Sequence, residues 1–219
     1  MKPAVYYPLF ADLRGRPCLI VGGGLVAQRK VVTLLGFGAR ITVVSPLITA
    51  KLAALARAGR IRHVARRFNA SDLRTAWLVY AATDEQAVNR EVSRQAARRR
   101  VFANVVDQPG LCSFIAPAIA RRGGLTVAIS TGGASPTMAR RLRDEVGRRL
   151  GPEYARLLRL LGGLRGVAKR RLPKYEDRKR YFDDLAQGRV FRLVQSGKTA
   201  AARRQALDLL GRYAARRRR

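Results

Sequence analysis

CLIVGGGLVAQRKVV, residues 18–32, places three consecutive glycines between an apolar run and a segment with helical spacing. The run before the glycines is typical of a buried strand. The apolar residues after them recur at helical intervals until Gly36 and Gly38. The stretch therefore predicts a strand, a tight turn and a helix. Two interpretations of the turn stay open: it binds a ligand, or it only redirects the chain.

The rest of the first half repeats this alternation. Strand-like runs are ARITVVSP, RIRHVARRF, AWLVYAAT and VFANVVD, and helix-like runs are LITAKLAALARAG and DEQAVNREVSRQAARRR. We expect Asp84 and Glu85 in the first turn of the second helix, where acidic residues are favoured. Strands and helices that alternate at these spacings form parallel βαβ units. The sequence thus predicts an α/β fold with a mostly parallel, Rossmann-like sheet and helices on both faces.

The pattern changes after residue 107. CSFIAPAIAR and GLTVAIST indicate two strands around the turn RRGG, and a helix follows with Ser135 near its N-cap and Pro136 in its first turn. Because these elements are poorly placed to join a parallel sheet, we assign them to dimerisation. We expect three parts: an NAD-binding domain over 1–112, a dimerisation segment over 113–150 and a small helical module over 151–219.

The helical module contains several residues that disfavour helix. We expect its helices to be broken at Gly162, Gly163, Pro173 and Gly197.

Composition limits the classes of protein. The 219 residues carry a formal charge of +31, with two cysteines and one histidine. A disulfide framework and a four-ligand zinc site are both excluded on these counts, so we expect no resident metal. No window resembles a membrane span or a signal peptide, which predicts a cytoplasmic protein without membrane association. The charge indicates an anionic partner or an arginine-rich background without a ligand, and both interpretations stay open.

The glycine turn fits a dinucleotide-binding loop. In such a turn the first glycine permits the bend, the second lets the backbone approach the pyrophosphate, and the third position must be small. Gly22, Gly24 and Ala27 match these roles in order. The predicted cofactor is NAD, and its predicted contacts are Gly22, Gly23, Gly24, Leu25, Val26, Ser45, Pro46 and Thr83.

The second strand ends in a serine where dinucleotide-binding proteins carry an acidic residue for the ribose, about 20 residues after the glycines. Ser45 can hydrogen-bond the ribose but does not repel a 2′-phosphate. The choice between NAD and NADP is therefore not determined by this residue.

Two further segments are candidates for chemistry. Asp107 follows a predicted strand, at the sheet edge where ligands of open α/β sheets bind, and is either a proton acceptor or a turn residue satisfied by nearby amides. The segment STGGASP is either an anion site or an ordinary capped helix start. Its candidate substrate contacts are Ser130, Thr131, Gly132, Gly133 and Ser135. We interpret His63 and Cys112 as structural residues.

These segments together resemble the precorrin-2 dehydrogenase family, which includes the amino-terminal module of sirohaem synthase and bifunctional dehydrogenase–ferrochelatases. The resemblance covers residues 6–150 and rests on YYPLFADLRGRPCLIVGGGLVAQRKVVTLLGFGARITVVSP, ATD, NVVDQPGLCSFIAPA and AISTGGASPTMARRLR. The carboxyl-terminal helices match only in type and length.

The resemblance implies NAD-dependent oxidation of precorrin-2 to sirohydrochlorin, and in some members insertion of ferrous iron as a second substrate. It also implies a homodimer, a catalytic aspartate at Asp107 and a glycine loop at residues 22–24. Thr131 stands where sirohaem synthase carries a serine, which leaves a serine-specific role in question. A polyanionic tetrapyrrole substrate agrees with the basic composition.

Two other functions stay open. The first is an NAD-dependent dehydrogenase of another substrate. The second is an NAD-sensing regulator that binds DNA through the basic carboxyl-terminal helices. Those helices show no helix-turn-helix pattern and the arginines are dispersed, so we expect no specific nucleic acid partner.

Overall fold

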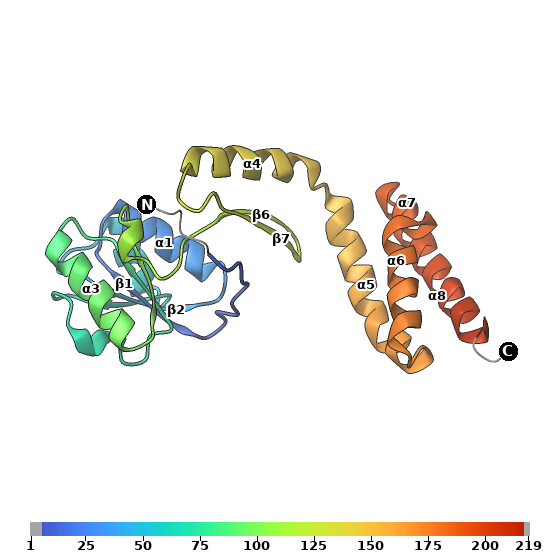
Figure 1. Ribbon diagram of the computed structural model, residues 1–219, viewed down its shortest axis with the longest axis horizontal. Helices are drawn as coiled ribbons and strands as arrows, with labels where there is room; N and C mark the ends of the chain where they lie inside the picture. Colours follow the sequence, from blue (N-terminus) through green and yellow to red (C-terminus); the bar gives the residue numbers. More distant parts are fainter. Residues whose placement is uncertain (1–5, 217–219) are drawn as a thin grey trace. The chain divides into compact units, whose positions relative to one another are not determined.

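The computed structural model describes residues 6–216. Its contacts divide the chain into two units (Figure 1). The first unit contains the residues up to Ala116 and the short segment Gly132–Ala134, and the second contains Pro117–Thr131 and the residues from Ser135 onward. The boundaries expected at 112 and 150 stay predictions.

The first unit is built around a five-stranded sheet in which every neighbouring pair is parallel, in the order β3-β2-β1-β4-β5. The predicted Rossmann-like sheet is confirmed. Its strands are β1 (Pro17–Val21), β2 (Arg40–Val44), β3 (Arg62–Val64), β4 (Leu78–Ala81) and β5 (Phe102–Val105). The connecting helices are α1 (Leu25–Leu35), α2 (Ala50–Arg57) and α3 (Gln86–Arg98), with the 3₁₀ turns η1 (Ala70–Leu73) and η2 (Pro109–Leu111).

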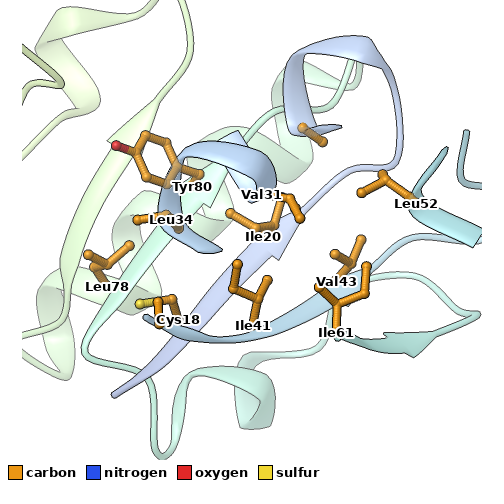
Figure 2. Close-up of a cluster of buried hydrophobic side chains, with 12 residues drawn as sticks. Cys18, Ile20, Val31, Leu34, Ile41, Val43, Leu52, Ile61, Leu78 and Tyr80 are labelled. Carbon is orange, nitrogen blue, oxygen red and sulfur yellow. The ribbon is translucent and has the colours of Figure 1, made fainter. Parts of the chain in front are cut away.

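Side chains alternate between the two faces of this sheet along each strand, and both faces are buried. Cys18 and Ile20 of β1 point to the face covered by α1 and α2 (Figure 2). Leu19 and Val21 point to the opposite core, which includes buried residues of α3. Full burial of one such side chain contributes about 1.5–3 kcal/mol, so the two cores fix the strand register and the sheet edge above them.

The strand order reverses between β1 and β4. The chain leaves β1 through α1 toward β2, whereas β4 and β5 lie on the other side of β1. At such a reversal of strand order, open α/β sheets bind their ligands outside the carboxyl ends of the strands. The turns after β1, β2, β4 and β5 meet this edge.

The start of α3 differs from the expectation. The helix begins at Gln86, so Asp84 and Glu85 precede it and no acidic residue lies in its first turn. The physical reason is a local hydrogen-bond network. The Thr83 hydroxyl lies 2.9 Å from Oδ1 of Asn89 and 3.2 Å from the Glu85 carbonyl oxygen, which holds this segment as a turn.

The second unit begins with an antiparallel hairpin. Strands β6 (Ala118–Arg122) and β7 (Leu125–Ile129) form a two-stranded sheet, and α4 (Pro136–Arg149) packs on it. The predicted strands and the predicted helix start are confirmed. Ser135 is the N-cap residue and Pro136 is the first helical residue.

A helical bundle completes the unit. Its helices are α5 (Pro152–Arg171), α6 (Tyr175–Gln187), α7 (Arg189–Gln195) and α8 (Thr199–Arg216). The expected break at Gly162 and Gly163 is wrong, because both lie within α5. A helical glycine costs about 1 kcal/mol, and the burial of Leu157, Leu164 and Ala168 in the bundle core offsets this cost. The short helix α7 was not expected, since it lies between Gly188 and Gly197.

Within residues 6–216 no helix combines the length and the apolar character needed to cross a membrane.

Candidate active site

The turn after β1 is held by backbone contacts that require glycine. The Gly22 amide donates to the Val44 carbonyl oxygen at 3.0 Å, and Gly22 has a φ of +115°, which side chains rarely adopt. A Cβ at Gly22 would lie 2.7 Å from the carbonyl carbon of Ala82. At Gly23 a Cβ would collide with the Leu47 carbonyl group and lie 2.9 Å from Cγ2 of Ile48. Glycine is therefore required at both positions by contacts within the protein, whether or not a ligand binds.

Gly24 differs from its two neighbours. Its φ is −80°, which any residue adopts, and a Cβ there would meet nothing within 4 Å. Gly24 is the N-cap of α1, and no side chain caps this helix. The first amides of a helix have no intrahelical acceptor and together bind anions. The open space and the uncapped amides fit a pyrophosphate group.

Ala27 lies one turn further along α1 and is fully buried in the core shared with the sheet. A small residue there lets helix and strand pack closely, as the predicted motif requires. Leu25 and Val26 form the first helical turn, and Leu25 is 69% exposed.

The turns after β2 and β4 carry the other predicted cofactor contacts. The half-buried Ser45 donates from its hydroxyl to the Leu47 carbonyl oxygen at 2.7 Å, so its oxygen lone pairs can still accept. Pro46 follows it on the surface. Thr83 is fixed by Asn89, whose amide nitrogen donates to the Thr83 carbonyl oxygen at 2.9 Å.

Sequence reasoning missed Asn89 as the residue that holds this turn. It is one of the few buried polar side chains of the described residues, at 4% exposure. A polar residue at a core-facing position of α3 was the available signal, because buried amides are hydrogen-bonded.

Asp107 lies in the turn after β5. The preceding Val106 amide donates to the Ala81 carbonyl oxygen at 3.0 Å, which extends the pairing of β5 with β4 to this edge. Asp107 then takes a φ of +58°, an uncommon conformation for a residue other than glycine. It is exposed, and within residues 6–216 its carboxylate forms no hydrogen bond or ion pair. The alternative of a turn aspartate held by nearby amides is thus not what this geometry shows.

The loop from Asp107 to Cys112 is anchored by sulfur. The Val105 amide donates to Sγ of Cys112 at 3.2 Å, and the thiol lies 3.2 Å from the Val105 carbonyl oxygen. Burial raises the pKa of this thiol, so it stays neutral and serves as a structural hydrogen-bonding group.

Lys30 of α1 also belongs to this region and was not among the predicted site residues. Its ammonium nitrogen lies 5.1 Å from the centre of the Tyr80 ring. Burial, and then the neighbouring Arg29, lower the pKa of this ammonium group, and the carboxylate of Asp107 partly opposes this shift.

The turn before α4 satisfies its own polar groups. The Thr131 hydroxyl accepts from the Ser135 amide and donates to the Ser135 carbonyl oxygen, each at 3.0 Å. The Ser135 hydroxyl accepts from the Met138 amide at 3.2 Å. Gly132 and Gly133 have φ values of +63° and +90°. The local geometry is that of a capped helix start, and the two hydroxyls each keep a role in it.

His63 has a structural position in the first unit. Nε2 of His63 lies 2.9 Å from the Ser45 carbonyl oxygen, a structural contact between β3 and the turn after β2. Among the described residues, no three His, Cys, Asp or Glu side chains are grouped to hold a metal ion.

Three features define the class of a dinucleotide-binding α/β protein: the parallel sheet, the glycine turn after β1, and the start of α1, which no side chain caps. A model of an NAD(P)-binding family matches residues 9–118, one for the central part of sirohaem biosynthesis proteins matches 122–149, and one for the sirohaem synthase dimerisation region matches 153–210. The nucleotide is accordingly a nicotinamide dinucleotide.

Curated relatives include two sirohaem synthases. That of Thioalkalivibrio sulfidiphilus is 44% identical over 198 residues, which are 90% of this chain and 40% of that protein. That of Methylobacillus flagellatus is 45% identical over 196 residues, 90% of this chain and 42% of that protein. The chain thus spans about two fifths of the length of these relatives.

A solved structure matches nearly the whole chain. The precorrin-2 dehydrogenase SirC superposes with a TM-score of 0.73 and 26% identity, covering 95% of this chain and all of SirC. The chain belongs to the precorrin-2 dehydrogenase and sirohaem synthase family.

Proposed function

We propose that this protein oxidises precorrin-2 to sirohydrochlorin with NAD as the hydride acceptor. The likeness to SirC over nearly the whole chain and the sirohaem synthase relatives support this reaction. The observation that carries it is Asp107, an exposed carboxylate in a left-handed backbone conformation at the carboxyl end of β5. Uncommon backbone conformations of this kind gather at functional sites.

The residues of the first unit divide the task of binding the dinucleotide. The uncapped amides from Gly24 to Val26 hold the pyrophosphate, and the Ser45 hydroxyl accepts from the ribose beside Pro46. Gly22 and Gly23 shape the turn, and Thr83 closes the site from the end of β4. A bound nicotinamide ring supplies the hydride acceptor. We propose NAD rather than NADP, and an affinity comparison of the two tests this choice.

Asp107 is the proposed proton acceptor. Oxidation of precorrin-2 releases one hydride and one proton from the macrocycle, and the carboxylate accepts the proton as a general base. The same carboxylate can receive pyrrole protons if ferrous iron is inserted into sirohydrochlorin, so we propose iron as a possible second substrate.

The substrate is a polyanionic tetrapyrrole, which a protein of charge +31 attracts. We propose that Ser130, Thr131, Gly132, Gly133 and Ser135 contribute to its binding. Because the hydroxyls of Thr131 and Ser135 are engaged locally, their contribution would come from remaining lone pairs and from nearby backbone groups.

We also propose that the protein is a homodimer. The match to the sirohaem synthase dimerisation region covers 153–210, whereas sequence reasoning gave this role to 113–150. In the described residues, β6 and β7 pair only with each other, and a two-stranded sheet is marginally stable by itself. Both segments therefore enter the proposed interface. A monomer by light scattering at micromolar concentration would contradict the proposal.

The decisive experiment is anaerobic incubation with precorrin-2 and NAD, followed by absorbance, with and without ferrous iron. Formation of sirohydrochlorin and NADH in equal amounts supports the dehydrogenase. If precorrin-2 is not oxidised and a different compound is, the alternative of an NAD-dependent dehydrogenase with another substrate would be favoured. Tight, sequence-selective DNA binding that survives moderate salt would favour the regulator. Cytoplasmic location stays a prediction.

A further inference from the structure

Lys30 holds a half-buried positive charge against the ring of Tyr80, which packs on Phe114 in the segment that follows Asp107. It lies in the second turn of α1, and its ammonium nitrogen lies 5.1 Å from the centre of the Tyr80 ring. The Tyr80 ring packs edge-on against Phe114, with 5.4 Å between ring centres. The ammonium group is thus placed on an aromatic surface between α1 and β4.

This charge has no direct acidic partner in the described part of the chain. The ion pairs and hydrogen bonds of residues 6–216 include none from the Lys30 ammonium. Burial, and then the neighbouring charge of Arg29, lower the pKa of Lys30, while Asp107 and Cys112 partly oppose this shift. Among the described residues, Asp107 forms no ion pair with this ammonium group.

A half-buried ammonium group loses hydration that a cation–π contact replaces only in part. Proteins meet this cost with a hydrogen-bonded anion. The described residues do not provide this anion, whereas the proposed tetrapyrrole substrate carries several carboxylates.

We infer that Lys30 binds a carboxylate of the tetrapyrrole substrate and so positions the macrocycle against Asp107. This inference rests on the proposed function and deepens it, since it assigns a substrate-positioning role to one lysine of α1. The Tyr80 ring contacts the ammonium group through a cation–π interaction. The Asp107 carboxylate stays available to accept the proton.

The alternative ligand is the pyrophosphate of the cofactor. Lys30 is five residues beyond the first residue of α1, about 7.5 Å along the helix axis at 1.5 Å per residue. Its side chain reaches the Tyr80 ring, which packs against Phe114 of the segment that follows Asp107. These contacts favour the substrate side of the site.

The test compares Lys30→Met, Lys30→Arg and the control Arg29→Met. Methionine keeps the length of the side chain on the Tyr80 ring but removes the charge. Arg29 is the exposed neighbour on the same helix, so its replacement removes one charge without changing the aromatic contact. The measurements are kcat and KM for precorrin-2, NAD affinity, and sirohydrochlorin binding by equilibrium dialysis without NAD.

For Lys30→Met we expect KM for precorrin-2 and the dissociation constant of sirohydrochlorin to rise about tenfold, the loss typical of one charge-assisted hydrogen bond. NAD affinity should stay within about twofold of the parent, and Lys30→Arg should recover most of the tetrapyrrole affinity. Arg29→Met should resemble the parent.

An equal change in Lys30→Met and Arg29→Met would overturn the inference, since general charge would then explain it. A loss of NAD affinity in Lys30→Met would assign the lysine to the cofactor and overturn it as well. A parent protein that neither oxidises precorrin-2 nor binds sirohydrochlorin would instead refute the proposed function itself.

Discussion

Two glycine-rich turns in this protein each lead into a helix, and they treat their polar groups in opposite ways. At the start of α1 no side chain caps the helix, and a Cβ at Gly24 would enter open space. At the start of α4 the hydroxyls of Thr131 and Ser135 satisfy the local amides. A glycine-rich turn therefore indicates an anion site only where the helix amides are left without a partner of their own.

The same contrast applies to carboxylates in the first unit. Asp72 accepts hydrogen bonds from Arg66 and from the Asn69 amide, whereas Asp107 has none within the described residues. We expect changes at the open groups to alter binding and catalysis, and changes at the satisfied groups to alter stability. The following predictions test this division.

Replacement of Asp107 by Asn should have the largest effect. Asparagine tolerates the positive φ of this position, so the fold and NAD affinity should be retained. Precorrin-2 oxidation should fall by about 10²–10⁴-fold, the range typical of losing a general acid or base. Single-turnover oxidation under anaerobic conditions measures this loss.

The matched control for Asp107 is Asp84→Asn, which removes an exposed carboxylate from the turn after β4. It should oxidise precorrin-2 within about threefold of the parent. An Asp107→Asn protein with parent-like turnover would remove this residue from the mechanism. Iron insertion should be assayed separately with sirohydrochlorin, to learn whether both reactions use one base.

Gly24→Val should weaken NAD binding by about 10–100-fold, because its side chain would occupy the space proposed for the pyrophosphate. The folded state should lose no more than about 1 kcal/mol, the cost of a poor N-cap residue. Calorimetric titration and thermal unfolding measure the two effects. Gly23→Ala should show the opposite pattern of mainly lost stability, since its Cβ would collide with the Leu47 carbonyl group. NAD binding equal to that of the parent in Gly24→Val would show that the loop is only a turn.

Asp72→Asn should reduce stability by about 1–2 kcal/mol at pH 7 and leave turnover unchanged. Partial burial works against the ionised form, but the hydrogen bonds from Arg66 and Asn69 outweigh it and lower the pKa of Asp72. A lowered folded-state pKa gives stability above the unfolded value, near 4, that is lost as the pH falls through the folded value. The difference between parent and variant in urea unfolding should therefore shrink below about pH 4. A difference that stays constant down to about pH 2 would exclude this ionisation.

Ser135→Ala should have the smallest effect, about 1 kcal/mol of stability through loss of the N-cap of α4. Thr137→Ala, an exposed change in the same turn, should be nearly neutral. If Ser135 acts only as a cap, KM for precorrin-2 should not change at a temperature where both variants are folded. A several-fold increase in KM would show that its hydroxyl also binds substrate.

The sequence predicted the parts of the site that depend on local pattern. Gly22 and Gly23 were identified because a strand precedes them, a helix follows and the motif opens a run of βαβ units, and the structure gives each a backbone reason. Lys30 and Asn89 were missed. The role of Lys30 depends on the Tyr80 ring, which approaches it only when α1 and β4 pack together. The role of Asn89 depends on its hydrogen bonds to Thr83, six residues earlier, which form only once α3 starts after that turn.

Helix ends show the same limit. The glycines at 162 and 163 predicted a break, but burial of the apolar stripe of α5 outweighed their low helix propensity. The acidic residues before α3 were expected inside it, but Thr83 and Asn89 fixed the turn ahead of the helix. In both cases a tertiary or medium-range contact exceeded a local preference worth about 1 kcal/mol.

The α/β class, the parallel strands, the dinucleotide turn and the family resemblance were all predictable from the residues, because periodicity, glycine placement and motif order are properties of neighbouring residues. Which polar groups stay without a partner became known from the folded chain. The hydroxyls of Thr131 and Ser135 are engaged and the Asp107 carboxylate is not, although all three were candidates on sequence grounds. Whether a polar group has a partner depends on distances and angles in the folded chain, and the residue types alone do not fix them.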